Sequence, residues 1–305
     1  MRVNVSSVQD FMQCRFRWWC RWVMNRVPVA ESPALDAGKL LHRAFEFHER
    51  SGEPLDKCLR DDCDTFRHKI PLQHPAAQPG LLKAVEMMED LVEAMPLWRD
   101  KFKVTEVLEV EQAHEWDDPE VEDLTWLLRP DRVVVVGNRV WHQQRRGLAA
   151  GQNFGTYTRL ALRHYHEHLY ARVLQGQYCS PTRKYGGTIF DLVRKLKFRT
   201  NVGKKNEKTK TAEEMFYQQA VAYDLRSGLH RSVMNSLYSH VEEMRRVIRL
   251  WEEDDVVPAP NEKLNGGFSG SSEDPYFKVL IGEIELDDED YFKEREDQYA
   301  GTPEE

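Results

Sequence analysis

The sequence lacks any run of about 20 apolar residues, the length needed to cross a bilayer. It also lacks a Cys-x-x-Cys pair, and its five cysteines are an odd number, which argues against both a disulfide framework and a structural zinc site. The N-terminus has no apolar stretch followed by small residues, so it does not resemble a signal peptide. We therefore expect a soluble, cytoplasmic protein with reduced, mostly buried thiols.

The chain has 305 residues, of which 41% are apolar and 31% charged, and it can bury a sizeable core. Helical periodicity dominates the first hundred residues, and alternation of apolar with polar residues predicts strands farther along. We predict a single domain over 1–305. Its parts are N-terminal helices over 1–100, an αβββαβ core over about 35–50 and 103–200, a long helical segment over 211–252 and an irregular acidic tail over 258–305.

The net charge of −8 hides a segregation of charge along the chain. Residues 283–305 hold eleven acids and two basic residues, a net charge of −9, so the rest of the chain sums to +1. Residues 11–30 are basic and interleaved with aromatics, and 194–210 hold eight Lys or Arg against one Glu. Such runs are usually solvated faces, but two of them favour a polyanionic partner such as nucleic acid. We interpret Trp18, Trp19 and Trp22 as core rather than base-stacking residues.

Residues 129–146, RPDRVVVVGNRVWHQQRR, predict a β-hairpin with a Gly-Asn turn. Asp131 precedes the first strand, while Gln144 and Arg146, two residues apart, share one face of the second. The three side chains can therefore converge. Metal-dependent phosphodiester hydrolysis needs oxygen ligands on rigid elements and a cation near the developing charge. An ordinary strand end also accounts for these residues.

Several short motifs follow one another in a characteristic order. They are SSVQDFMQCRFRWW near the N-terminus, GKLLH (38–42), LLRPDRVVVV, VWHQQRRGL, RHYHEHLYARVL and GGTIFDLVRKLKFR. In this order they resemble the PD-(D/E)XK nuclease superfamily in its RecB-like branch, which includes CRISPR adaptation exonucleases and phage exonucleases. The second motif is similar to a G-x-x-x-H motif, the fourth to the strand that ends in Glu- or Asp-x-Lys, and the fifth to a Q-x-x-x-Y helix. The resemblance runs from about residue 6 to 300.

The resemblance implies an α/β fold with a restriction-endonuclease-like core, a small mixed sheet flanked by helices, with added N-terminal and C-terminal helices. It implies a Mg²⁺- or Mn²⁺-dependent deoxyribonuclease, an exonuclease acting on DNA ends or single strands in recombination, repair or phage DNA metabolism. A recombination protein or helicase would be its partner, and the host cytoplasm its location if a phage encodes it. The implied catalytic residues are Asp131, Gln144 and Arg146, and the implied metal ligands are His42, Asp131 and Gln144. The implied DNA contacts are Tyr170, Arg194, Lys195, Lys197, Arg199, Lys204 and Lys205.

Some of these residues, and a few others, have two interpretations. His42 is either a metal ligand or an ordinary helix histidine. His164 and His168, four residues apart, have the spacing of a transition-metal pair, but we expect solvated histidines. Residues 103–115 alternate in the manner of one half-buried strand. Glu109 and Glu111 share a face of this strand and could assist a metal site, although an exposed face explains them equally well.

The chain departs from the family pattern at three places. Arg146 stands where Lys is expected, and Gln144 stands where a carboxylate is usual. Many relatives bind an iron–sulfur cluster through late cysteines, but residues 265–283 contain none, with Asp274 and Ile281 near those places, so we predict no cluster. These departures leave open a second function, a catalytically impaired nuclease-fold protein for DNA binding or assembly. A third interpretation, an acidic protein without a nucleic-acid role, rests on net charge alone.

Overall fold

The computed structural model describes residues 1–30, 32–149, 151–161, 163–195, 197–200, 202, 208–260, 274–280 and 282–295. The chain divides into two compact units. Unit 1 consists of Met1–Val29, Ala113–Arg129 and Ser227–Glu305, and unit 2 of Ala30–Gln112 and Pro130–Arg226. Among the residues described, no helix combines the length and the apolar character needed to cross a membrane.

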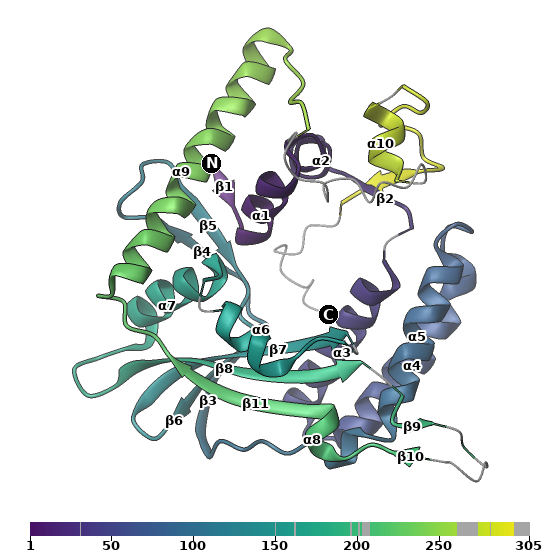
Figure 1. Ribbon diagram of the computed structural model, residues 1–305, viewed down its shortest axis with the longest axis vertical. Helices are drawn as coiled ribbons and strands as arrows, with labels where there is room; N and C mark the ends of the chain where they lie inside the picture. Colours follow the sequence, from purple (N-terminus) through teal and green to yellow (C-terminus); the bar gives the residue numbers. More distant parts are fainter. Residues whose placement is uncertain are drawn as a thin grey trace. The chain divides into compact units, whose positions relative to one another are not determined.

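Unit 2 is built on a five-stranded mixed sheet with the strand order β11-β8-β7-β6-β3 (Figure 1). β7 and β8 run parallel, and the other neighbouring pairs are antiparallel. Val136 pairs with Arg139 across the Gly137-Asn138 turn, where Gly137 has a φ of 64°, a conformation that glycine adopts at little cost. The predicted hairpin is therefore confirmed. The strands are β3 (Val104–Val110), β6 (Arg132–Val136), β7 (Arg139–Ala149), β8 (Lys184–Lys195) and β11 (Phe216–Ala222).

Helices cover both faces of this sheet (Figure 1). On β7, the Arg145 guanidinium donates to Glu49 of α3, whereas His142 lies 3.7 Å from Glu167 of α7. Residues three apart on a strand point to opposite faces, so α3 and α7 lie on opposite sides of the sheet. The longer helices of unit 2 are α3 (Pro33–Ser51), α4 (Leu55–Lys69), α5 (Gln78–Val92), α6 (Phe154–Ala161) and α7 (Tyr165–Tyr178). Shorter elements are α8 (Ala212–Met215), β9 (Arg199–Thr200), β10 (Lys208–Thr209) and single 3₁₀ turns at Ile70–Leu72 and Met95–Leu97.

The predicted fold class is confirmed. Unit 2 is an α/β arrangement with a small mixed sheet flanked by helices. Its α3 face is filled by side chains of α3, α4 and α5 packed on the sheet, with Leu40, Leu59 and Met88 fully buried. Its other face packs against α6 through Leu148 and Phe190 and against α7 through Val133 and Val140. Burial on both faces explains why the strands are so rich in Val, Ile and Leu.

The described residues of unit 1 form two small sheets and one long helix, with shorter helical segments. β1 pairs in parallel with β5, which pairs in antiparallel fashion with β4, and β2 pairs with β12. α9 buries one face through side chains such as Leu237 and Val241, three to four residues apart, as the sequence pattern predicts. The elements are β1 (Arg2–Val3), α1 (Val5–Gln13), α2 (Arg15–Trp18), a π-helical stretch (Trp19–Val23), β2 (Arg26–Pro28), β4 (His114–Asp117), β5 (Thr125–Leu128), α9 (Gly228–Asp254), α10 (Pro275–Leu280) and β12 (Phe292–Glu294).

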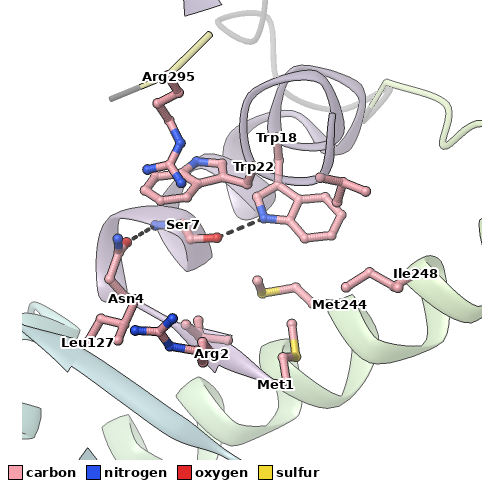
Figure 2. Close-up of a pocket in the computed structure, with 12 residues that line it drawn as sticks. Met1, Arg2, Asn4, Ser7, Trp18, Trp22, Leu127, Met244, Ile248 and Arg295 are labelled. Carbon is pink, nitrogen blue, oxygen red and sulfur yellow. Dashed lines mark hydrogen bonds between the residues drawn. The ribbon is translucent and has the colours of Figure 1, made fainter. Parts of the chain in front are cut away.

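The N-terminal aromatics belong to the core of unit 1. Trp18 and Trp19 are buried, and the Trp18 indole N–H donates to Ser7 Oγ at 2.9 Å (Figure 2). The Ser7 N–H in turn donates to Asn4 Oδ1, which caps α1. A small cavity of about 140 Å³ remains beside Trp18 and is lined by residues of α9 such as Met244. The interpretation of Trp18 and Trp19 as core residues is confirmed.

The sequence patterns failed at two places. The segment predicted as helical over 211–252 contains strand β11, and α9 begins only at Gly228. β11 forms because Phe216 and its alternate neighbours pair with β8 over seven positions, a partner too distant in sequence to be read from local periodicity. Residues 103–115, expected as one strand, are split into β3 and β4, which belong to different sheets. The five cysteines are free thiols, four of them buried, as expected.

Candidate metal centre

Three neighbouring strands bring Glu111, at the end of β3, Asp131, before β6, and Gln144, in the middle of β7, into one row. Glu111 follows β3, Asp131 precedes β6, and the Glu111 N–H donates to the Asp131 carbonyl oxygen at 3.2 Å. The register of β6 on β7 pairs Arg132 with Gln143, so the next step of the same register sets Asp131 opposite Gln144. Opposed residues of an antiparallel pair share a face, and these two side chains therefore lie on the same side of the sheet.

His42 reaches this row from helix α3. Its Nδ1 lies 3.1 Å from Glu111 Oε1 and 3.7 Å from Asp131 Oδ1. One ligand atom from each of these three residues lies within 4.8 Å of the others. Burial lowers the pKa of His42, but the two carboxylates outweigh it and raise that pKa above its ordinary value. An imidazole and two carboxylates in this arrangement form a candidate site for a divalent cation.

Asp131 is held in place by the neighbouring strand. The Arg145 N–H donates to Asp131 Oδ2 at 2.6 Å. On the opposite face, the Arg145 guanidinium donates to Glu49 Oε1 at 2.7 Å, and the Arg132 guanidinium lies 2.9 Å from Glu49 Oε2. Glu49 belongs to α3, the helix that also carries His42. Buried ion pairs therefore attach α3 to the two strands that position Asp131.

Gln144 has an unpaired polar atom beside this site. Its side chain is only 5% exposed, and its Oε1 has no hydrogen-bond partner among the described residues. A buried carbonyl oxygen without a partner costs about 1–3 kcal/mol, so it requires an explanation. A cation would supply one, because amide carbonyl oxygens are ordinary ligands of hard divalent ions. The donors present on this chain thus fit Mg²⁺ or Mn²⁺.

Arg146 lies two residues beyond Gln144 on the same face of β7 and is exposed. Within the described part of the chain it makes no hydrogen bond or ion pair, although its charge is felt at His42 and at Tyr157 of α6. Arg146 is therefore near the candidate metal centre but is not tied to Asp131. A guanidinium left unpaired in this way can bind an incoming phosphate.

The α7 face next to Arg146 is rich in buried polar side chains. Burial, and next the positive charge of Arg146, lower the pKa of His166 to about 3. Glu167 is fully buried and accepts a hydrogen bond from Thr188 Oγ1 at 2.6 Å. The expectation of a solvated His168 is wrong, because this side chain is 2% exposed. It falls on the stripe of α7 that faces the sheet, together with the buried residues Ala171 and Leu174.

The residues expected to contact DNA have varied environments. Lys197 lies 3.7 Å from Asp90, and Arg199 lies 3.1 Å from Glu93; both acids belong to the α5 region. Lys195 Nζ donates to a backbone carbonyl at the start of α3. Lys204 and Lys205 lie outside the described residues, as do Ile281 and most of the late segment discussed above.

The other two expected contacts lie on the opposite side of the sheet from α3. The Arg194 guanidinium lies over the ring of Phe154 in α6, 4.2 Å from its centre. Tyr170 is half-buried, and its ring centre is 4.6 Å from that of His142. Neither position by itself tests a role in DNA binding, which stays a prediction.

This geometry defines a class: an α/β protein with a candidate divalent-cation site at the strand ends of a hairpin. A model of the PD-(D/E)XK nuclease superfamily matches residues 2–140. The predicted resemblance to this superfamily is thereby confirmed for residues 2–140. Members of this superfamily are generally hydrolytic nucleases that use divalent metals, and the match therefore suggests a nuclease with DNA as its substrate. No curated protein matches the sequence.

The match includes His42, Glu111 and Asp131 and ends before Gln144 and Arg146. The sequence alone is compatible with Glu111 as either a metal ligand or an exposed strand residue. The structure places its carboxylate next to His42, whereas Glu109 accepts a hydrogen bond from Tyr178 instead. The supporting role of Glu49 was missed, because no local pattern links a helix glutamate to arginines about 85 to 95 residues later.

Proposed function

We propose that this protein is a divalent-metal-dependent deoxyribonuclease of the RecB-like type, an exonuclease acting on DNA ends or single strands in recombination, repair or phage DNA metabolism. The observation that carries the proposal is the cluster of His42, Glu111 and Asp131, whose ligand atoms lie within 4.8 Å of one another. The unpaired carbonyl oxygen of Gln144 beside it adds a fourth donor. Mg²⁺ or Mn²⁺ bound by these residues would supply Lewis-acid stabilisation of charge on the scissile phosphate.

The protein's own residues supply binding and orientation. Asp131 is fixed by the Arg145 N–H, so its carboxylate is preorganised rather than free to rotate. Arg146 occupies the position of the usual Lys, where its planar guanidinium can donate two hydrogen bonds to phosphate oxygens and stabilise the developing negative charge. Arg146 remains protonated at all relevant pH values, so it cannot act as a general base. The attacking water must lose its proton to another group.

Arg146 also favours a second candidate function. An arginine that binds the phosphate without positioning water would leave the protein a DNA-binding or assembly module on the nuclease fold. Gln144 points the same way, because a neutral amide binds a divalent cation less strongly than the carboxylate usual at this position. Both functions require DNA binding, and they differ in cleavage.

The experiment is cleavage of end-labelled single-stranded and double-stranded DNA with Mn²⁺. Four proteins are compared: wild type, Asp131→Ala, Arg146→Lys and, as the matched control, Arg139→Lys at the exposed turn of the same strand. The proposed function predicts cleavage by wild type and by Arg139→Lys, and none by Asp131→Ala. Release of mononucleotides from one end would establish the exonuclease. Cleavage by Arg146→Lys alone would instead establish the binding module, and no cleavage by any variant would refute the nuclease proposal.

A further inference from the structure

Helix α6 lies in the longest part of the chain without a carboxylate. No Asp or Glu occurs between Asp131 and Glu167, whereas this interval holds six arginines. Two of them, Arg132 and Arg145, form ion pairs with Glu49 on the α3 face of the sheet. Arg159 of α6 and Arg163, which follows it, are exposed, so the surface around α6 is positively charged.

α6 is firmly attached to the sheet by one side. The Phe154 ring stacks on Tyr217 of β11, with centres 5.1 Å apart and planes 7° apart. Thr158 Oγ1 donates to Gln219 Oε1 at 3.0 Å, again on β11. The opposite side of the helix therefore has a fixed orientation toward solvent. Its exposed residues include Arg159, and Arg163 follows the helix four positions later.

The cations of this surface have no acidic partner among the described residues. Arg159 hydrogen-bonds only to Gly155 and Thr156 of its own helix, and Arg163 makes only a backbone hydrogen bond. Arg194 stacks on Phe154 and donates to a backbone carbonyl. Lys197 and Arg199, on the same chain segment as Arg194, are by contrast paired with acids, Asp90 at 3.7 Å and Glu93 at 3.1 Å.

This surface borders the candidate metal centre. The centre of the Tyr157 ring lies 6.1 Å from that of Phe190, which pairs with Gln144 in the register of β8 on β7, and 6.4 Å from that of His164. Tyr157 lies on α6 between Phe154 and Arg159, and His164 directly follows Arg163. The unpaired Arg146 is therefore continuous with the exposed cations of α6 along one face of unit 2.

We propose that Arg159, Arg163 and Arg194 form the surface that holds the phosphate backbone of a DNA strand and leads it to the candidate site, and that Lys197 and Arg199 are not main contacts. Unpaired cations release counterions when they meet phosphates, whereas a cation already paired with a carboxylate must first give up that partner. The proposal rests on the proposed function for the identity of the polyanion, a DNA strand. Its test measures binding alone.

The experiment measures the affinity of the full chain for a fluorescent single-stranded oligonucleotide in EDTA, at several salt concentrations. Arg159→Gln/Arg163→Gln is compared with the matched pair Lys197→Gln/Arg199→Gln, which removes the same charge from paired positions. On single strands each lost phosphate contact makes the slope of log K against log salt shallower by about 0.7. We expect a change of about 1.4 for the α6 pair, since two contacts are lost, and little change for the control pair.

Each outcome has a distinct meaning. An equal loss of affinity and slope in both pairs, or a loss confined to the control pair, overturns the proposal while leaving the nuclease function untouched. A wild type that does not bind DNA overturns it together with the choice of substrate. Binding that depends on the α6 pair in a protein that never cleaves supports the surface and rejects only the nuclease. Circular dichroism of both double variants establishes that their folds are intact.

Discussion

The Arg145 N–H donates to Asp131 Oδ2 at 2.6 Å. Arg145 lies between Gln144 and Arg146 on β7, and its backbone thus holds the candidate metal ligand Asp131 in place. Strand alternation permits this double use. Gln144 and Arg146 face the candidate site, while the Arg145 side chain points to the other face and pairs with Glu49. The chemistry of one face is thus supported by ion pairs on the other.

Glu111→Gln should weaken Mn²⁺ binding. Replacing one of two clustered carboxylates by an amide removes a charged ligand. We expect Mn²⁺ affinity to fall by at least about tenfold, because even residues that only hydrogen-bond to a metal ligand change affinity by that factor. Titration calorimetry with Mn²⁺ measures the change. Glu109→Gln, two residues earlier, is the matched control, because its carboxylate accepts a hydrogen bond from Tyr178 instead of contacting His42. Equal effects of the two substitutions would remove Glu111 from the site.

Gln144→Glu should have the opposite effect on the metal. A carboxylate at this position completes a set of three anionic ligands around His42, and we expect Mn²⁺ affinity to rise by about tenfold, or ~1.4 kcal/mol. Without metal the new charge faces Asp131 across the strand pair, so the melting temperature in EDTA should fall. Gln144→Leu, which removes the carbonyl donor at similar size, should weaken binding. An unchanged affinity in both variants would show that residue 144 does not contact the ion.

His166→Gln should reduce the dependence of stability on pH. The pKa of His166 is lowered to about 3 in the folded protein, whereas an unfolded histidine titrates near 6.5. The unfolded state therefore binds a proton that the folded state rejects, and stability is lost as pH falls below about 6.5. Urea midpoints at pH 7.5 and 5 should differ more for wild type than for the variant. A variant with the same difference as wild type would show that this group does not titrate as the structure indicates.

The parts of the site that could be predicted are those that depend on local pattern. The turn at Gly137-Asn138 fixes the register of β6 on β7, and period-two alternation then sets Asp131 opposite Gln144. Glu111 escaped this reasoning because β3 is irregular: its pairing with β6 shifts twice before it ends, and Glu111 itself has a φ of 48°. Alternation counted along 103–115 cannot follow such a strand, and it grouped Glu111 with Glu109.

Strand pairing between distant parts of the chain explains the other difference between the predicted and the observed elements, over 211–252. The apolar residues of 211–252 fit a helical period throughout, yet the first part of this segment pairs with the free edge of β8 and forms strand β11.

Gly187 lies where β8 and β11 meet, with a φ of 133° and space so limited that a Cβ would lie 2.1 Å from the Val221 carbonyl oxygen. Gly187→Ala should therefore destabilise the protein more than Gly176→Ala, where a Cβ has nothing within 4 Å. Urea denaturation of the two variants compares them directly.

Glu49→Gln should both destabilise the protein and weaken Mn²⁺ binding at the candidate site. Glu49 is the shared partner of Arg132 and Arg145, whose side chains are 7% and 2% exposed, so the substitution leaves two buried cations with less compensation. Breaking a buried ion pair from one side costs about 3–5 kcal/mol. Glu89→Gln, which breaks the solvent-exposed pair with Arg67, should cost far less, because solvent screens exposed ion pairs. Urea denaturation measures both, and Mn²⁺ titration of folded Glu49→Gln should show weaker binding because α3 carries His42. A stable Glu49→Gln with normal Mn²⁺ affinity would mean that the ion pairs do not position the helix.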